Sequence, residues 1–230
     1  MLRRSTAASY LIFITCLLLN GCATGSRGMS ASECTEADWQ AVGLADGRDG
    51  AHSGIGEQRF TQCEGASVAP DRAAYQKGLA AGLLEFCEPR GGFLHGVKGK
   101  EYAFNCAREQ EPKFIRAYQI GYDEYELKQA VRDADRLVNR NRTDMQSAQT
   151  DVKRLEAQYY GSANASRSEI NRINAELNRI RRRVLQLQGE RAGHRAALDQ
   201  AQTLLKKYRK TRPLIPGLDK DEATAASEQN

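Results

Sequence analysis

Apolar residues recur at alternating steps of three and four through most of the second half of the chain, from about Ala117 to Tyr208. A repeat that averages 3.5 residues keeps one apolar seam on the same side of a helix, which is typical of a coiled coil. The repeat is interrupted once, at Gly161-Ser162-Ala163-Asn164. The pattern therefore predicts two long helices joined by a turn at about residues 161–165.

Only four seam positions are strongly polar: Glu124 and Asn141 in the first helix, and Arg191 and His194 in the second. The other positions of the first seam are Ala117, Ile120, Leu127, Val131, Ala134, Val138, Met145, Ala148, Val152, Leu155 and Tyr159. Those of the second seam are Ile170, Ile173, Leu177, Ile180, Val184, Leu187, Leu198, Ala201, Leu205 and Tyr208.

Antiparallel pairing of the two helices places Met145 against Ile180 and Val138 against Leu187. The chain then folds back between Ser162 and Ala163, inside the one interruption of the repeat. This agreement favours a hairpin, while an intermolecular bundle or a longer open helix remains the alternative.

The predicted ends of the two helices carry the expected residue types. Pro112 suits the first helical position of the first helix, and Pro213 prevents the second from continuing. Ser166 and Glu169 have the spacing of a capping box, in which each side chain satisfies a backbone amide of the other residue.

The N-terminal stretch has the features of a targeting segment. Arg3 and Arg4 precede an apolar run over residues 10–19, which is too short to span a bilayer. The run ends in Leu19-Asn20-Gly21-Cys22, which resembles the lipobox of bacterial lipoproteins. That resemblance implies removal of residues 1–21, acylation of Cys22 and a tether over residues 22–33. Ala23 after the acylated residue resembles the pattern of Gram-negative lipoproteins exported to the outer membrane.

Four cysteines remain beyond the signal and the acylation site: Cys34, Cys63, Cys87 and Cys106. An even number in an exported chain indicates two disulfides with three connectivities, of which proximity along the chain favours Cys34–Cys63 and Cys87–Cys106. A zinc site that adds His52 or His95 is the alternative, but the spacing contains no C-x-x-C pair. We therefore expect no metal site.

The same region repeats an aromatic residue followed by closely spaced glycines. The pattern occurs at residues 39–47 and 75–82, with a weaker copy at 118–125. Glycine lowers helix propensity, so close approach of two helices is the natural compensation. Gly91 to Gly99 is predicted to be a loop.

Positive charge is concentrated in the predicted rod. The chain has a net charge of +5, yet residues 112–212 carry 22 Lys and Arg against 12 Asp and Glu, whereas residues 22–111 carry 9 against 13. A basic rod on a mildly acidic base indicates an anionic partner such as acidic lipid, cell-wall polymer or acidic protein. A solvated helix surface is the alternative. The candidate contacts are Arg179, Arg181, Arg182 and Arg183.

The order of cysteines, glycines and aromatics over residues 34–125 resembles the bacterial lipoprotein family called domain of unknown function 2799 (DUF2799). The residues that carry the resemblance are Cys34, Asp38, Trp39, Gly43, Asp46, Gly47, Cys63, Tyr75, Gly78, Gly82, Cys87, Gly96, Gly99, Tyr102, Cys106, Tyr118 and Gly121. The family has no assigned activity, so the resemblance supports location and fold without indicating a reaction.

The chain contains no nucleophile elbow, zinc-protease motif or P-loop, so we expect neither an enzyme nor a cofactor. Aromatic side chains suggest one alternative, a cell-wall glycan-binding module in which sugars stack on Trp39, Tyr75 and Tyr102.

The sequence thus predicts an all-α protein with a small disulfide-clamped helical domain at residues 34–111. A coiled-coil hairpin follows at residues 112–212, and a disordered tail at 213–230. We expect an outer-membrane-anchored periplasmic lipoprotein that acts as a structural or interaction scaffold of the cell envelope. The expected partners are the membrane, through Cys22, and peptidoglycan or an envelope protein. Self-association through the coiled coil is a further expectation, and nucleic acid is not expected.

Overall fold

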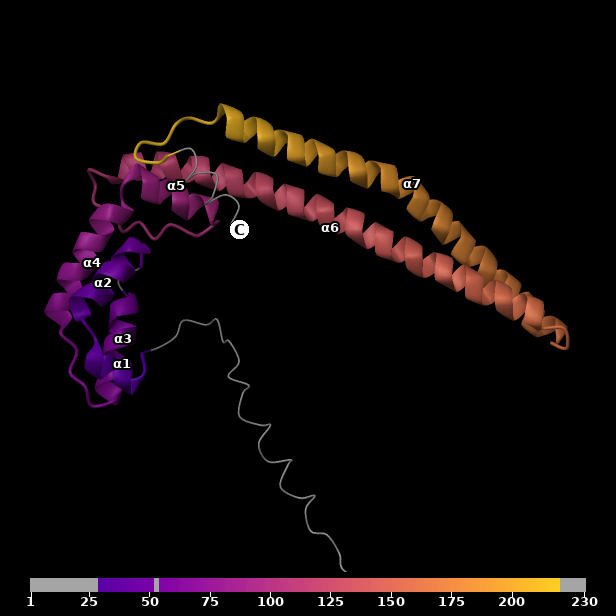
Figure 1. The fold of residues 1–230 in the computed structure, drawn as a ribbon, viewed down its shortest axis with the longest axis horizontal. Coiled ribbons are helices and arrows are strands. Elements are labelled where there is room, and N and C mark those ends of the chain that lie inside the picture. Colours follow the sequence, from indigo (N-terminus) through magenta and orange to yellow (C-terminus); the bar gives the residue numbers. More distant parts are fainter. Residues whose placement is uncertain (1–28, 52–53, 220–230) are drawn as a thin grey trace, which may run out of the picture.

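The computed structural model describes residues 29–51 and 54–219, and every regular element within them is a helix (Figure 1). The elements are α1 (Ala31–Glu36), α2 (Trp39–Arg48), α3 (Gly54–Gly65), α4 (Arg72–Phe86), α5 (Pro89–Val97), α6 (Glu111–Gly161) and α7 (Arg167–Thr211). The all-α class is confirmed. The signal peptide, Cys22 and the tether up to residue 28 lie outside the described residues.

The molecule has a short arm and a long arm. Figure 1 shows α1 to α4 gathered into a base, α5 at the corner, and the α6–α7 hairpin leading away as a rod. Helix α6 has 51 residues, which corresponds to a length of about 75 Å. Its first turns pack on α5. The boundary predicted at residue 112 therefore falls where α6 starts, but this helix belongs to both arms.

Two parallel helix pairs build the base. Helix α2 lies along α4, and α5 lies along the start of α6. A Cβ atom at Gly47 would lie 2.5 Å from the carbonyl oxygen of Leu79, and one at Gly96 would lie less than 3.0 Å from that of Tyr118. Backbone therefore packs on backbone in both pairs, as the glycine pattern predicted.

The two pairs are geometric copies of one unit. Gly50, with φ of +68°, faces the ring of Phe86, and Gly99, with φ of +66°, faces the ring of Tyr125 in the same way. Three of the four remaining glycine contacts of α2·α4 recur in α5·α6 at a constant offset along each helix, and Gly78 has no glycine counterpart. The three copies of the sequence pattern lie in α2, α4 and α6. The structure places these helices, together with α5, in two repeated pairs.

Each unit is closed by one disulfide that ties the segment before its first helix to the segment that crosses over to its second. Cys34–Cys63 serves the first unit and Cys87–Cys106 the second. The pairing favoured by proximity is confirmed. The bonded cysteines other than Cys106 are almost fully buried.

The prediction of a loop from Gly91 to Gly99 is wrong, because most of that segment forms α5. Pro89 occupies the start of the helix, where its missing amide proton is no loss. The glycines lower helix propensity, but Gly92 and Gly96 allow the backbone of α6 to approach. Tertiary contact therefore decides the conformation of this segment.

Side chains cap the starts of three helices, and Ser166 was predicted to be one of these caps. Asp38 accepts hydrogen bonds from the amides of Gln40 and Ala41, and Asp71 accepts one from Ala74. Ser166 Oγ accepts from the amide of Glu169, 3.3 Å away, at the start of α7, which is one of the two bonds of the predicted capping box. These caps satisfy amides that have no partner within the helix.

The rod is an antiparallel hairpin, as predicted, with its turn between Gly161 and Arg167. Its core consists of two apolar clusters. One contains Met145, Ala148 and Leu187, and the other contains Leu155, Ile173 and Leu177. Val152, Ile180 and Val184 pack against them half-buried.

The register of the hairpin differs slightly from the predicted one. Leu187 was expected opposite Val138, but its carbonyl oxygen accepts a 3.0 Å hydrogen bond from the side-chain amide of Asn141. Because the turn is centred later in the chain than Ser162, α7 is shifted along α6 by about one helical turn relative to the predicted register. Asn141 is 4% exposed, and its bond makes other registers costly because they would leave this amide unpaired.

The segment after the rod is also structured, contrary to the prediction of disorder from residue 213. Ile215 is 6% exposed and joins Phe93, Val97 and Ala117 in a core at the corner. Leu218 packs against the same cluster. The chain up to Asp219 therefore belongs to the base, because Ile215 and Leu218 cover one side of the corner core.

Candidate functional site

The distal rod carries a shallow apolar groove between its two helices. Two turns from each helix line it, with the same residue spacing on both, and it has a volume of about 720 Å³. The lining residues are Gln149, Val152, Lys153 and Glu156 of α6 and Arg181, Val184, Leu185 and Gln188 of α7. Leu185 is 67% exposed. A two-helix rod thus leaves apolar surface that a third helix would cover.

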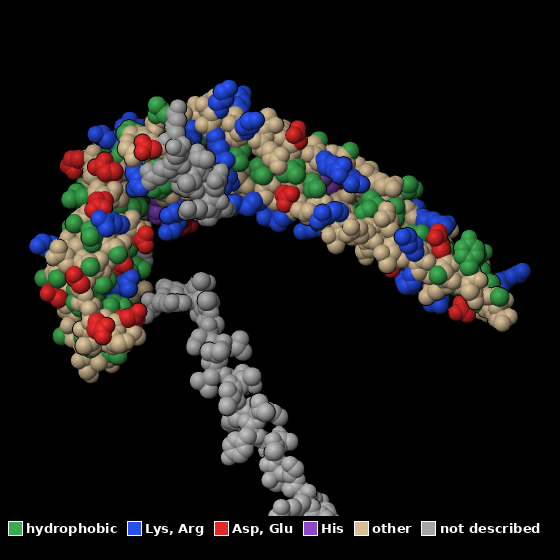
Figure 2. All heavy atoms as spheres, in the orientation of Figure 1, with side chains coloured by type: hydrophobic (Ala, Val, Ile, Leu, Met, Phe, Trp, Pro, Cys, Tyr) green, Lys and Arg blue, Asp and Glu red, His purple; other side chains and the backbone are tan. Residues whose placement is uncertain are grey.

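The four arginines expected to contact an anionic partner lie on the distal half of α7 and point in several directions around it. Three of them have carboxylate partners on this chain. Arg179 lies 4.0 Å from Glu176, Arg181 lies 2.7 Å from Glu156, and Arg183 lies 3.6 Å from Asp144. These pairs are exposed and therefore weak, so a partner could replace them. Figure 2 shows Lys and Arg side chains along the length of the rod.

Where the rod joins the base, one carboxylate is fully buried. Glu124 is 0% exposed; its Oε1 accepts a 2.8 Å hydrogen bond from Arg209 Nε, and its Oε2 lies 3.4 Å from Arg212 Nε. The Arg212 guanidinium stacks 4.4 Å above the Phe93 ring. Glu124 appeared in the sequence only as a break in the seam. Its partners lie at the C-terminal end of α7, far from Glu124 along the chain, so the sequence alone could not identify them.

Lys128, one turn along α6, is 7% exposed, and its Nζ has no hydrogen-bond partner among the described residues. Burial lowers the pKa of this amine, and the neighbouring Arg132 and Arg209 lower it further. A buried ammonium without a partner destabilises its surroundings.

Two of the three aromatic residues proposed to stack on sugars cannot do so. Trp39 is 7% exposed and Tyr75 is 1% exposed, and both rings pack against Phe60 in the core of the first unit. Burial in this core leaves no ring face for a ligand. Tyr102 is half-buried between Phe104 and Phe114.

The same core holds a polar triad that the sequence did not reveal. Arg59 donates two 2.8 Å hydrogen bonds to the carboxylate of Asp46, and the Tyr75 hydroxyl donates a third of 2.9 Å. Burial, together with the hydrogen bond to Asp46, raises the pKa of Tyr75. Since every charge in the triad has a partner, its function is to tie α3 to the first helix pair.

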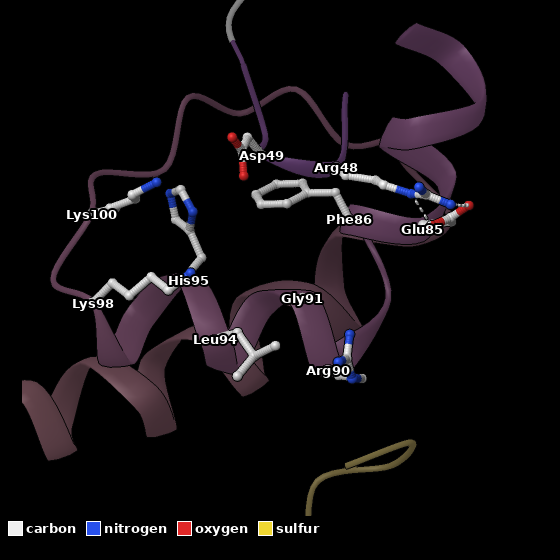
Figure 3. A pocket seen from close by; sticks show the side chains of 10 residues that line it. All are labelled: Arg48, Asp49, Glu85, Phe86, Arg90, Gly91, Leu94, His95, Lys98 and Lys100. Carbon is white, nitrogen blue, oxygen red and sulfur yellow. Dashed lines mark hydrogen bonds and ion pairs between the residues drawn. The ribbon is translucent and has the colours of Figure 1, made fainter. Parts of the chain in front are cut away.

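A polar hollow of about 270 Å³ lies between the two units of the base, beside α5 (Figure 3). Its walls come from the ends of α2 and α4, one face of α5, and the crossover segment that follows α5. His95 lies in its wall and is the positional equivalent of Asp46. The sequence had considered His95 only as an alternative zinc ligand.

No set of metal-binding side chains is found among the described residues. The four cysteines form disulfides, which removes them from the zinc alternative. Within the ranges that the structure describes, no helix is long and apolar enough to cross a bilayer.

These observations define a class of protein: a disulfide-closed pair of helical units that carries a coiled-coil rod. Residues 38–123 match the family described as "Protein of unknown function (DUF2799)", so this part of the chain is similar to that family. The match covers both units of the base and ends in α6 at the root of the rod. No curated protein and no solved structure matches the chain.

Proposed function

We propose that this chain is a lipid-anchored protein of the outer membrane that faces the periplasm and works as an interaction scaffold. Cys22 would carry the anchor, the base would hold the rod, and the rod would bind an acidic helix of another envelope protein. The lipobox-like sequence and the oxidised state of four cysteines support the location. The proposal assigns no catalytic activity to the chain.

The groove on the distal rod is the observation that carries this function. Its two walls have helical spacing, and Leu185 projects from one of them. An amphipathic helix laid into the groove would complete a three-helix bundle. The rod as a whole carries 22 Lys and Arg against 12 Asp and Glu, which favours an acidic partner and opposes a second copy of the same rod.

In-cell photocrosslinking tests the partner. A benzophenone amino acid at Gln188, on the groove, should give an adduct with one envelope protein, whereas the same group at Gln202, exposed on α7 away from the groove, should not. Leu185→Gln should remove the adduct and Leu204→Gln should leave it, because both leucines are exposed but only Leu185 lines the groove.

The identity of the adduct decides the outcome. A crosslinked segment that mass spectrometry maps to an acidic helix supports the proposal. An adduct of two copies of this chain, or equal labelling from Gln188 and Gln202, contradicts it.

Membrane fractionation tests the anchor separately. Cys22→Ser should release the protein from membranes, because the acyl chains supply the binding energy. Fractionation that does not change, together with no incorporation of labelled fatty acid, would show that Cys22 is not the anchor.

A further inference from the structure

The hollow between the two units of the base has an uneven charge. Four cationic side chains line it, namely Arg48, Arg90, Lys98 and Lys100, against two carboxylates, Asp49 and Glu85. Arg48 and Glu85 neutralise each other through two hydrogen bonds of 2.6 and 2.9 Å. The remaining surface is therefore positive, and a concave surface concentrates such a potential.

Figure 3 shows how these groups are arranged. Lys98 and Lys100 gather beside His95 at one end of the hollow, and the Arg48–Glu85 pair closes the other end. Phe86 lies between the two ends, and Leu94 lies on α5 beneath them. The hollow thus offers cations at one end and apolar contact beside them.

The two units differ at the equivalent positions of Asp46 and His95. In the first unit Asp46 is an anion, and the crossover segment supplies a cation to it through Arg59. In the second unit His95 occupies the equivalent place, and the crossover supplies only the carbonyl oxygen of Glu101, 2.9 Å from Nε2. The hollow holds one carboxylate, Asp49, beside the exposed Lys98 and Lys100, so its net charge at this end is positive and favours an anion.

We propose that the hollow between the two units binds a phosphate group, held by Lys98 and Lys100 beside His95, with its organic substituent against Leu94. Ammonium groups bind phosphate as point charges and tolerate varied geometry, which suits two lysines on different segments. A volume of about 270 Å³ exceeds the needs of a single phosphate, since a water molecule takes about 30 Å³. The hollow therefore has room for a phosphate monoester or the headgroup of a phospholipid. This inference does not depend on the groove of the rod.

His95 provides a direct readout of binding. Burial lowers its pKa, and the charges of Lys100 and Lys98 lower it further. A bound phosphate counters those charges, so the pKa of His95 should rise. The chain has three histidines, and the ring signals of His95 can be assigned by their loss in His95→Gln.

The experiment is an NMR titration of the purified full chain with inorganic phosphate and with glycerol 3-phosphate, at constant ionic strength set with chloride. We expect saturable shifts of the His95 ring and a higher pKa at saturation. The double variant Lys98→Gln/Lys100→Gln should weaken binding about tenfold or more, because two charge-assisted contacts are lost. The matched control Lys206→Gln/Lys207→Gln on α7 should bind like the parent chain.

Vesicles distinguish the two sources of the phosphate. If addition of phosphatidylglycerol vesicles shifts His95 and the Lys98/Lys100 variant loses this shift, the ligand is a lipid headgroup. If glycerol 3-phosphate shifts the His95 signals and the vesicles do not, the ligand is a free phosphate monoester. Shifts that do not saturate, or equal binding by both double variants, would overturn the proposal; circular dichroism of each variant confirms that it is folded.

Discussion

The base and the rod reach stability by opposite means. In the base, helices approach until glycine Cα atoms touch the neighbouring backbone, and two disulfides close the crossover segments. In the rod, large aliphatic side chains fill a seam, and glycines such as Gly189 and Gly193 have no atom near the place of a Cβ. The same residue type is therefore obligatory in one arm and replaceable in the other.

This contrast separates two kinds of information. A seam of aliphatic side chains tolerates exchange among residues of similar volume, whereas a backbone contact tolerates no added atom. Two signals report the arms separately. Trp39, the only tryptophan, is buried in the base, and the helices of 51 and 45 residues dominate far-ultraviolet circular dichroism.

The largest expected effect is in the rod. Ile173→Asp should lower the free energy of unfolding of the rod by about 4 kcal/mol, because it removes a buried aliphatic side chain and places a charge on the seam. Urea unfolding followed by circular dichroism measures the change, with Arg182→Asp as an exposed control on the same helix. If Trp39 fluorescence shifted as much as the dichroism, the arms would not be independent.

Loss of a disulfide should act in the base. Cys34→Ser/Cys63→Ser should destabilise it by about 3 kcal/mol, because the bond closes a loop with a sequence separation of 29 residues and lies in the same core as Trp39. The midpoint of Trp39 fluorescence in urea should fall, and the dichroism of the distal rod should change less. An unchanged fluorescence midpoint would mean that helix packing alone holds the base.

Adding one methyl group should have opposite signs in the two arms. Gly82→Ala should destabilise the base by about 2–3 kcal/mol, because its Cβ would lie less than 3.0 Å from backbone atoms of Leu44 and Arg48. Gly189→Ala should stabilise the rod by up to about 1 kcal/mol through helix propensity alone. Thermal unfolding of the two variants measures both changes. If both variants were less stable than the parent chain, the proposed contrast between the base and the rod would be wrong.

The smallest effect concerns pH. Burial lowers the pKa of His95, so the folded base binds fewer protons than the unfolded chain below the ordinary histidine pKa of about 6.5. Its contribution is therefore complete above that pH and is lost as the pH falls. The fluorescence midpoint should drop between pH 7.5 and 5.5, and His95→Gln should reduce the drop, whereas His194→Gln on the rod should not. An equal drop in all three proteins would rule out His95 as the cause.

Local signals in the sequence were sufficient wherever the structure depends on period or proximity. The 3.5-residue repeat located both rod helices, and the single break in that repeat located the turn. Ser166 marked the start of α7, because an N-cap needs only a nearby side-chain oxygen. The disulfide pairing favoured by proximity along the chain is also confirmed, because each bond closes its own unit.

Tertiary structure decided whatever depends on a partner far away in the chain. Helix α5 exists because α6 lies against its glycines, and no property of residues 91–99 alone indicates this. The register of the rod was settled by the bond from Asn141 to Leu187, since a heptad seam permits neighbouring registers of similar burial. The buried Glu124, the triad at Asp46 and the hollow beside His95 likewise arise from side chains that only folding brings together. Periodicity fixes which face of a helix is apolar, but the identity of the group that meets that face is a property of the whole fold.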